Sequence, residues 1–425
     1  MTRKLLVLLC TLVSWHSPAQ AQDGKHWVAS WGTAPMLLVD PPQSWVRPPP
    51  ADAMPKNPAP SPIPPVPKEL HDQSVRMIVR SSVAGDKLRL QFSNAQGVQP
   101  ALLGGVHVAR HSGNGAIDAK TDHALTFGGK TSVTLHPGGL VVSDPVDMAV
   151  PALAELAVTV YVPDTTATAT RHELGLNTTR IAKGNVLSAP TLTATETNRS
   201  YFWLAGVEVL APLQTGMVIA FGDSITDGFM TSVDAHKDCP SLLAVRLQQN
   251  KTTAALGVVN MGISGNRVLR TGAGASALTR FDRDVLARGG VHWMVLLEGI
   301  NDINFTALPG VPDDQKTTAT QIIEGLSQLV DRAHANGIKV MGATLTPMGG
   351  LWLFNPDTEA MRQAVNAWIR SSGKYDAIVD FDAATRDPQQ NTRLKPEFDS
   401  GDHIHPNDAG NAAMAAVIDI GVFTR

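Results

Sequence analysis

The sequence predicts an α/β protein in two parts: an antiparallel β-sandwich, then a three-layer α/β/α domain built on a five-stranded parallel sheet. Two changes along the chain predict this. Between residues 72 and 210, apolar and polar residues alternate in short runs, as in strands with one buried face. Beyond Thr215 the apolar runs become continuous and alternate with helical stretches, as in a parallel sheet covered on both faces.

Composition narrows the class of protein. The chain has 425 residues, a formal net charge of −3 and 43% hydrophobic residues, enough for a large core. There is no basic patch for nucleic acid and no long basic run for a membrane surface. We therefore expect neither nucleic acid nor a membrane as a partner.

The N-terminus predicts export. Arg3 and Lys4 precede the apolar run LLVLLCTLV, and Ala19-Gln20-Ala21 supplies small residues for cleavage, so residues 1–21 are predicted to be a secretory signal. The apolar run is too short to span a bilayer, which takes about 20 residues. We expect a secreted or periplasmic protein without stable membrane insertion.

Residues 22–71 are predicted to form a strand followed by a proline-rich loop. Trp27, Ala29 and Trp31 alternate with other residues as on one side of a strand. Residues 41–67 contain twelve prolines, which restricts them to extended chain or loop. This stretch is either a solvent-exposed excursion, the simpler interpretation, or a cover over a cleft.

Residues 72–212 are predicted to form the β-sandwich. Five alternating runs are separated by Gly, Pro, Asp and Asn, which favour turns. The runs are VRMIVRSSV, KLRLQFSN, LGGVHVAR, KTSVTLHP and ELAVTVYVP.

Residues 213–425 are predicted to form the α/β/α domain. Its expected strands are MVIAF, GVVNM, WMVLLEG, KVMGATL and AIVDF, and helices are expected near 240–249, 277–288, 316–336, 357–371 and 408–421. Apolar residues recur at helical spacing through Thr317–Ala335, and Asn336-Gly337 is expected to end that helix.

Chemically competent residues follow these strands where ligands gather, at the carboxyl ends of a parallel sheet. Ser224 follows the first strand, Gly265 the second and Asn301 the third, and Asp402 and His405 precede the last helix. Each alone has a commonplace explanation, such as a helix cap or a turn. Their ordered occurrence at strand ends favours a catalytic site.

Together these residues suit acyl transfer. His405 would take the proton of the Ser224 hydroxyl, and Asp402 would orient the imidazole. The backbone N–H groups of Ser224 and Gly265 and the amide of Asn301 would stabilise the oxyanion.

Four short blocks, FGDSITDG, GISGN, GIND and DHIHP, resemble in order those of the SGNH (GDSL) hydrolases. The resemblance covers about residues 216–425 and implies a flavodoxin-like domain, nucleophile Ser224, oxyanion donors Gly265 and Asn301, and the couple Asp402/His405. Ile225 stands where that family has leucine. The N-terminal half, with WVASWGTAP and FSNAQG, is similar to an exported branch of SGNH esterases. The resemblance implies an ester hydrolase without cofactor that acts on short acyl groups, often acetyl groups on carbohydrates.

Neighbouring polar residues have supporting or competing interpretations. Asp223, Asp227 and Asp302 are predicted to organise the loop backbones around the site. His403 beside Asp402 and His405 could indicate zinc, but no fourth ligand supports it, so no metal is predicted.

Three further features predict no chemistry. Cys239 could be a nucleophile but suits a partly buried helix start better. GAGASA at 272–277 is expected to be a mobile glycine loop bordering the cleft, because no strand runs directly into it. GGKTS at 128–132 lacks the first glycine of a phosphate loop.

The leading hypothesis is an exported serine esterase acting on a small-molecule or polysaccharide ester. The alternatives are a lipase or arylesterase of the same fold, and a carbohydrate-binding protein with a vestigial hydrolase domain. The oligomeric state stays open.

Overall fold

The computed structural model describes residues 24–36 and 65–424. The predicted signal at 1–21 and most of the proline-rich stretch lie outside the described residues. None of the helices in the described ranges is long and apolar enough to cross a membrane.

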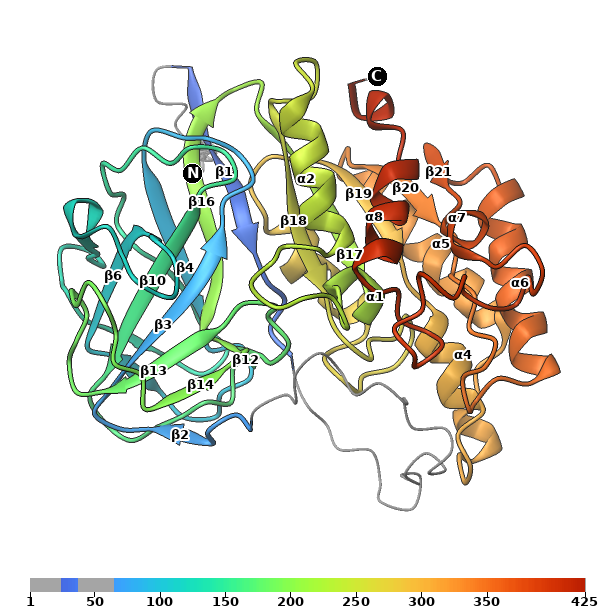
Figure 1. Ribbon diagram of the computed structural model, residues 1–425, viewed down its shortest axis with the longest axis horizontal. Helices are drawn as coiled ribbons and strands as arrows, with labels where there is room; N and C mark the ends of the chain where they lie inside the picture. Colours follow the sequence, from blue (N-terminus) through green and yellow to red (C-terminus); the bar gives the residue numbers. More distant parts are fainter. Residues whose placement is uncertain (1–23, 37–64, 425) are drawn as a thin grey trace, which may run out of the picture.

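The N-terminal region consists of antiparallel sheets, as predicted (Figure 1). A four-stranded sheet has the order β1 (Lys25–Gly32), β16 (Leu204–Pro212), β4 (Leu88–Ser93), β9 (Leu140–Val142). A six-stranded sheet has the order β14 (Glu196–Asn198), β13 (Thr179–Lys183), β3 (Gln73–Arg80), β10 (Glu155–Val162), β6 (Gly105–Arg110), β7 (His123–Ala124). The N-terminal region also contains three two-stranded sheets: β11 (Thr166–Ala167) with β2 (Glu69–Leu70), β12 (Arg171–His172) with β15 (Tyr201–Phe202), and β5 (Ala101–Leu103) with β8 (Val133–Leu135).

Period-two patterning places one face of each large sheet in a shared core. The alternate residues of β3 and β4 belong to the same buried cluster: Val75, Met77, Val79, Leu88, Leu90 and Phe92. The opposite face of β3 is not uniformly polar, because Ile78 on that face belongs to a small, separate apolar cluster. The predicted sandwich is confirmed.

The C-terminal region is a parallel five-stranded sheet, also as predicted. The order is β18 (Leu256–Gly262), β17 (Gly216–Gly222), β19 (Val291–Leu297), β20 (Lys339–Ala343), β21 (Ala377–Val379). In chain order this is 2-1-3-4-5, the flavodoxin-like arrangement, whose strand order reverses beside the first strand. That strand, β17, is buried along its whole length.

Helices cover both faces of this sheet, α2 and α8 on one side and α3, α5 and α6 on the other (Figure 1). The α-helices are α1 (Ser224–Asp227), α2 (Cys239–Gln249), α3 (Ala277–Phe281), α4 (Ile300–Thr306), α5 (Ala319–Ala335), α6 (Pro356–Ser371), α7 (Phe381–Thr385) and α8 (Asp408–Val417). Short 3-10 turns lie at Ala119–Thr121, Asp313–Gln315 and Ile420–Thr424, and a π-helical turn at Asp282–Leu286.

The helix predictions differ from the structure mainly at the ends. The predicted cap of α5 is confirmed, because Asn336 ends the helix and Gly337 follows at φ 72°. The helix expected over 408–421 ends at Val417, where Ile418 turns extended and a separate 3-10 turn follows. The short helices α1, α4 and α7 were not predicted, since they are too brief to show a helical period.

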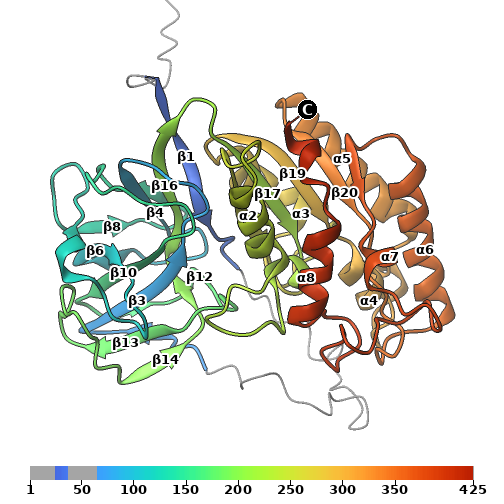
Figure 2. The same ribbon diagram turned by 45° about the horizontal axis from the view of Figure 1, so that its top comes forward.

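The two regions are joined closely. Only residues 213–215 separate β16 from β17. β1 lies on the side of the β-rich region that faces the α/β region (Figure 2), where it contacts β18. A Cβ on Gly32 of β1 would lie 2.6 Å from the end of the Met261 side chain of β18, so the two strands approach closely and a larger residue would displace Met261. The Ala29 N–H also donates to the Gly289 carbonyl across the junction, at 3.1 Å.

Candidate active site

Ser224 lies where the buried strand β17 gives way to α1. Asp223 caps this helix, because its Oδ1 accepts the Ile225 N–H at 2.9 Å. Gly228 then ends the four-residue helix in the left-handed conformation, at φ 97°. Ser224 is therefore the first helical residue and not the cap, and its N–H has no acceptor within the helix.

His405 and Asp402 complete a hydrogen-bonded chain to this serine. The His405 Nε2 lies 2.8 Å from the Ser224 Oγ, and its Nδ1 lies 2.5 Å from the Asp402 Oδ2. The Asp402 carboxylate accepts a hydrogen bond from the Nδ1–H of His405. In the neutral imidazole, Nε2 then carries a lone pair that can accept a hydrogen bond from the Ser224 hydroxyl. This is the arrangement in which an imidazole removes a proton from a serine.

The charge of Asp402 is well supported. Burial alone would raise its pKa, but the charge and hydrogen bond of His405 outweigh burial, and so do the N–H groups of Ile404 and His405. Together they lower its pKa to about 2. Phe229 packs edge-on against the His405 ring, with centroids 4.7 Å apart, and helps to fix the imidazole plane.

The two other predicted oxyanion donors lie on adjoining segments. Gly265 adopts φ 77°, a left-handed conformation, in the turn after β18, and a Cβ there would lie 2.9 Å from the Ala273 side chain. Asn301 is the second residue of α4, and its Nδ2 donates one hydrogen to the Asn266 carbonyl at 3.0 Å. Its second amide hydrogen remains for an oxyanion.

Arg280 of α3 forms hydrogen bonds with several of these segments, and its side chain is fully buried. Its guanidinium donates to the Gly222 carbonyl at 2.8 Å and to the Met261 carbonyl at 2.7 Å. Its Nε donates to the Asn266 side chain at 2.9 Å. One residue therefore joins the end of the nucleophile strand, the end of β18 and the loop that carries Gly265.

The buried carboxyl groups of Asp223 and Glu298 lie near this arginine, and each has an oxygen without a hydrogen-bond partner. Burial raises the pKa of Asp223 to about 7 and that of Asp302 to about 6, and raises that of Glu298 well above its usual range. The Asp223 Oδ2 and the Glu298 Oε1 have no hydrogen-bond partner, and the latter lies 3.6 Å from Arg280. Strongly shifted acids of this kind gather at functional sites.

The predicted supporting roles of the three aspartates differ in detail. Asp223 caps α1, and Asp302 accepts the backbone N–H groups of Val268 and Leu269 at 2.7 and 3.2 Å, so both organise loop backbone as expected. Asp227 instead contacts side chains: its Oδ1 lies 3.0 Å from His172 and its Oδ2 accepts the Ser264 hydroxyl at 3.1 Å.

The competing interpretations find little support. His403 contacts Asp399 at 2.6 Å and does not join Asp402, and no group of metal-binding side chains forms within the described ranges. Cys239 opens α2 as a buried thiol whose pKa is raised by burial, which opposes a nucleophilic role. The loop at 272–277 was expected to be mobile, yet Asn266 donates to the carbonyls of Ala273 and Ala275 within it.

Three residues of the site were not predicted: Arg280, Glu298 and His172. Glu298 could have been noticed, because a carboxylate ends the apolar run WMVLLEG. Arg280 sits in a stretch of mixed charge, and His172 lies in the other region, so the sequence gives no signal for either.

A known protein family matches the α/β region of the chain, which carries Ser224, Asp402 and His405. The GDSL-like lipase/acylhydrolase family matches residues 220–413. No curated protein sequence matches the chain.

Several solved structures resemble about half of the chain. A putative lipolytic protein of the G-D-S-L family from Desulfitobacterium hafniense is 20% identical, covers 49% of this chain and 99% of its own, and has a TM-score of 0.36. An acetylxylan esterase from Geobacillus stearothermophilus is 21% identical, covers 49% and 96%, and has a TM-score of 0.39. A GDSL-like lipase from Bacteroides thetaiotaomicron is 21% identical, covers 49% and 88%, and has a TM-score of 0.35.

Proposed function

We propose that this chain, of which residues 220–413 match the GDSL-like lipase/acylhydrolase family, is a serine carboxylic ester hydrolase that removes short acyl groups, acetyl above all, from carbohydrates. The observation that carries the ester chemistry is the 2.8 Å contact between the Ser224 hydroxyl and the His405 imidazole, with Asp402 behind it. A vestigial domain would have no reason to keep this chain of hydrogen bonds intact.

The proposed reaction proceeds in two steps. The Ser224 Oγ attacks the ester carbonyl as His405 takes its proton, and the tetrahedral intermediate expels the alcohol, which receives that proton. Water, deprotonated by His405, then attacks the acyl-serine and releases the carboxylic acid and the free hydroxyl of Ser224. Asp402 stabilises the imidazolium that forms in each step.

Charge that develops on the carbonyl oxygen is proposed to be stabilised by three donors. These are the backbone N–H groups of Ser224 and Gly265 and the free amide hydrogen of Asn301. Because Arg280 and Asn266 hold the segments that carry them, these donors need little rearrangement when the charge appears.

The short acyl group of the proposal rests on the resemblance of the four strand-end blocks to the SGNH hydrolases. The carbohydrate part of the proposal rests on the resemblance of the N-terminal half to an exported esterase branch. Export rests on the predicted signal at residues 1–21, so the mature chain is proposed to begin at Gln22.

The chemistry is tested with p-nitrophenyl acetate and the Ser224→Ala variant. Loss of hydrolysis in the variant is expected, and full activity would overturn the proposal. A series of esters from acetyl to decanoyl tests the acyl group, because rates that rise with chain length would favour a lipase.

The acceptor is tested by measuring acetate released from acetylated xylan, pectin, xyloglucan and chitin oligomers. Release from at least one of them is expected. No release from any, with p-nitrophenyl acetate still hydrolysed, would favour a small-molecule arylesterase.

A further inference from the structure

The β-rich region contributes a side chain to the surroundings of the nucleophile helix. We infer that His172 is a positioning residue of the hydrolase, which holds the loop carrying Gly265 through Asp227 and Ser264. The inference rests on the function proposed above. It gives the β-rich region a part in turnover that is separate from any binding of carbohydrate.

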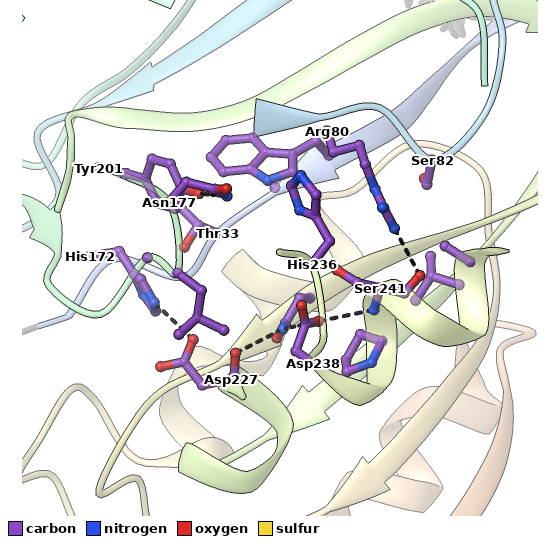
Figure 3. A pocket seen from close by; sticks show the side chains of 18 of the residues that line it. Thr33, Arg80, Ser82, His172, Asn177, Tyr201, Asp227, His236, Asp238 and Ser241 are labelled. Carbon is purple, nitrogen blue, oxygen red and sulfur yellow. Dashed lines mark hydrogen bonds and ion pairs between the residues drawn. The ribbon is translucent and has the colours of Figure 1, made fainter. Parts of the chain in front are cut away.

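A line of hydrogen bonds crosses the junction, and Figure 3 shows its middle bond, between His172 and Asp227. It starts at the Ala34 carbonyl, 2.9 Å from the His172 Nδ1, and the His172 Nε2 lies 3.0 Å from the Asp227 Oδ1. The Ser264 hydroxyl then donates to the Asp227 Oδ2 at 3.1 Å. Ser264 immediately precedes Gly265, so the line ends at a proposed oxyanion donor.

The two partners of His172 determine its protonation. The Ala34 carbonyl can only accept, so Nδ1 carries a hydrogen, and the Asp227 carboxylate requires a second hydrogen at Nε2. These two contacts favour the imidazolium form of the ring, whose side chain is only 3% exposed. Burial and the Arg280 charge lower the pKa of His172, but the Asp227 charge and the two hydrogen bonds outweigh them and raise it.

Asp227 can transmit a displacement to the site because its backbone is packed closely against β18. It is the last residue of α1, three residues after Ser224, and a Cβ on Gly262 would lie 2.3 Å from its backbone nitrogen. The Asn260 side chain also donates to the Thr226 carbonyl at 2.9 Å. A displaced Asp227 would therefore move the helix and the end of β18 together.

Packing alone does not hold His172 and Asp227 in place. Both line a polar cavity of about 80 Å³ between the two regions, together with Thr33, Tyr201 and Asp238 (Figure 3). On that side the pair faces open space and not a close-packed core. The hydrogen bonds therefore carry the positioning, and their loss should matter more than the loss of side-chain volume.

Two isosteric variants separate the two bonds of His172. In His172→Gln the amide nitrogen replaces Nε2 and keeps the bond to Asp227. In His172→Asn it replaces Nδ1 and keeps the bond to Ala34. Both variants are neutral at this position and each loses one bond, so we expect similar losses of thermal stability.

Their activities should differ. With p-nitrophenyl acetate we expect kcat to fall on the order of 10- to 100-fold in His172→Asn, with KM changed less than threefold, because a small displacement of oxyanion donors affects the transition state above all. His172→Gln should recover most of that loss. Equal kcat values in the two variants would overturn the inference.

Two further variants guard against misfolding. Ser264→Ala removes only the last bond of the line on a half-buried side chain, and kcat is expected to fall about tenfold. Arg80→Gln is the matched control, because Arg80 lines the same cavity and donates across the junction to the Ser241 carbonyl at 2.9 Å without reaching the loop. Its kcat should stay within twofold of the wild type.

The outcomes keep the two proposals apart. A wild-type kcat in Ser264→Ala would overturn this inference and leave the esterase intact. A fall in Arg80→Gln equal to that in His172→Asn would also overturn it, because the junction as a whole would then be responsible. A wild type without activity would instead overturn the proposed function.

Discussion

Arg76 in the β-rich region and Arg280 in the α/β region are both fully buried, but their guanidinium groups have different partners. Arg76 donates to four neutral acceptors: the Thr159 hydroxyl and the carbonyls of Gly115, Leu187 and Ala189. Arg280 donates to carbonyls at the carboxyl ends of β17 and β18, to the Asn266 side chain and to the Asp284 carboxylate.

The difference shows what each buried charge is for. Arg76 on β3 forms hydrogen bonds with backbone carbonyls of neighbouring loops. All the acceptors around it are neutral and hydrogen-bonded, so its role is structural. Arg280 lies among carboxyl groups with unpaired oxygens, at the edge of the sheet where the reacting serine stands. Incomplete satisfaction is costly to folding and is tolerated where the site needs charge. His172 is the point at which the β-rich region also serves that site.

The largest effect expected is on the hydrogen-bonded chain itself. His405→Ala and Ser224→Ala should each lower kcat by about 10⁴-fold or more, and the double variant should lose no more than either alone, because the two residues act as a unit. Hydrolysis of p-nitrophenyl acetate measures this. His403→Gln is the control: the glutamine amide nitrogen replaces Nε2, so the variant loses the Nδ1 contact with Asp399 and should leave kcat within threefold. Additive losses would contradict the assignment.

Next in size is the oxyanion donor on α4. Asn301→Ala should lower kcat by about 10²–10³-fold, the usual cost of one such donor, with little change in KM. Comparing kcat with KM for p-nitrophenyl acetate tests this. A loss confined to KM would mean that Asn301 binds the substrate and does not stabilise charge.

The two buried arginines can be compared directly by lysine substitution, which keeps the charge and loses the forked geometry. Arg76→Lys and Arg280→Lys should each reduce the free energy of unfolding by about 1–3 kcal/mol, as buried acceptors lose partners. Only Arg280→Lys should lower kcat, by about tenfold. Urea unfolding and turnover on the same samples decide this, and equal kcat values would remove the distinction between the regions.

The smallest effect concerns the pH dependence of stability. Asp223 has a pKa of about 7 when folded, against an ordinary value of 3.8, so folding favours its protonated form. Its contribution to stability is complete below pH 3.8 and is lost as the pH rises through 7. Asp223→Asn keeps an amide oxygen for the Ile225 N–H but does not titrate.

The free energy of unfolding of Asp223→Asn, relative to the wild type, should therefore increase by about 2 kcal/mol between pH 5 and pH 7. Urea titrations at the two pH values measure it. A constant difference would show that Asp223 is ionised throughout.

Long periodic segments and the four strand-end blocks could be predicted because their signals are local. The apolar face of α5 and the alternation in β3 follow directly from burial on one side. The blocks name Ser224, Gly265, Asn301, Asp402 and His405, and the structure brings Ser224, Asp402 and His405 into one hydrogen-bonded chain.

What could not be predicted depends on contacts between distant segments. Arg280 looks like one of several charges in ALTRFDRD, and only the sheet shows that it reaches two strand ends. His172 and Asp227 are 55 positions apart, in different regions, and neither belongs to a pattern that would pair them. The left-handed Gly265 could be suspected, but its contact with Ala273 could not.

The seating of β1 against β18 restricts how this enzyme can be cut. β18 is the outermost strand of the parallel sheet on that side, so residues 213–425 made alone would expose its edge and invite foreign strands to pair with it. An engineer who wants a minimal hydrolase from this chain must redesign Leu256–Gly262 before discarding the N-terminal half.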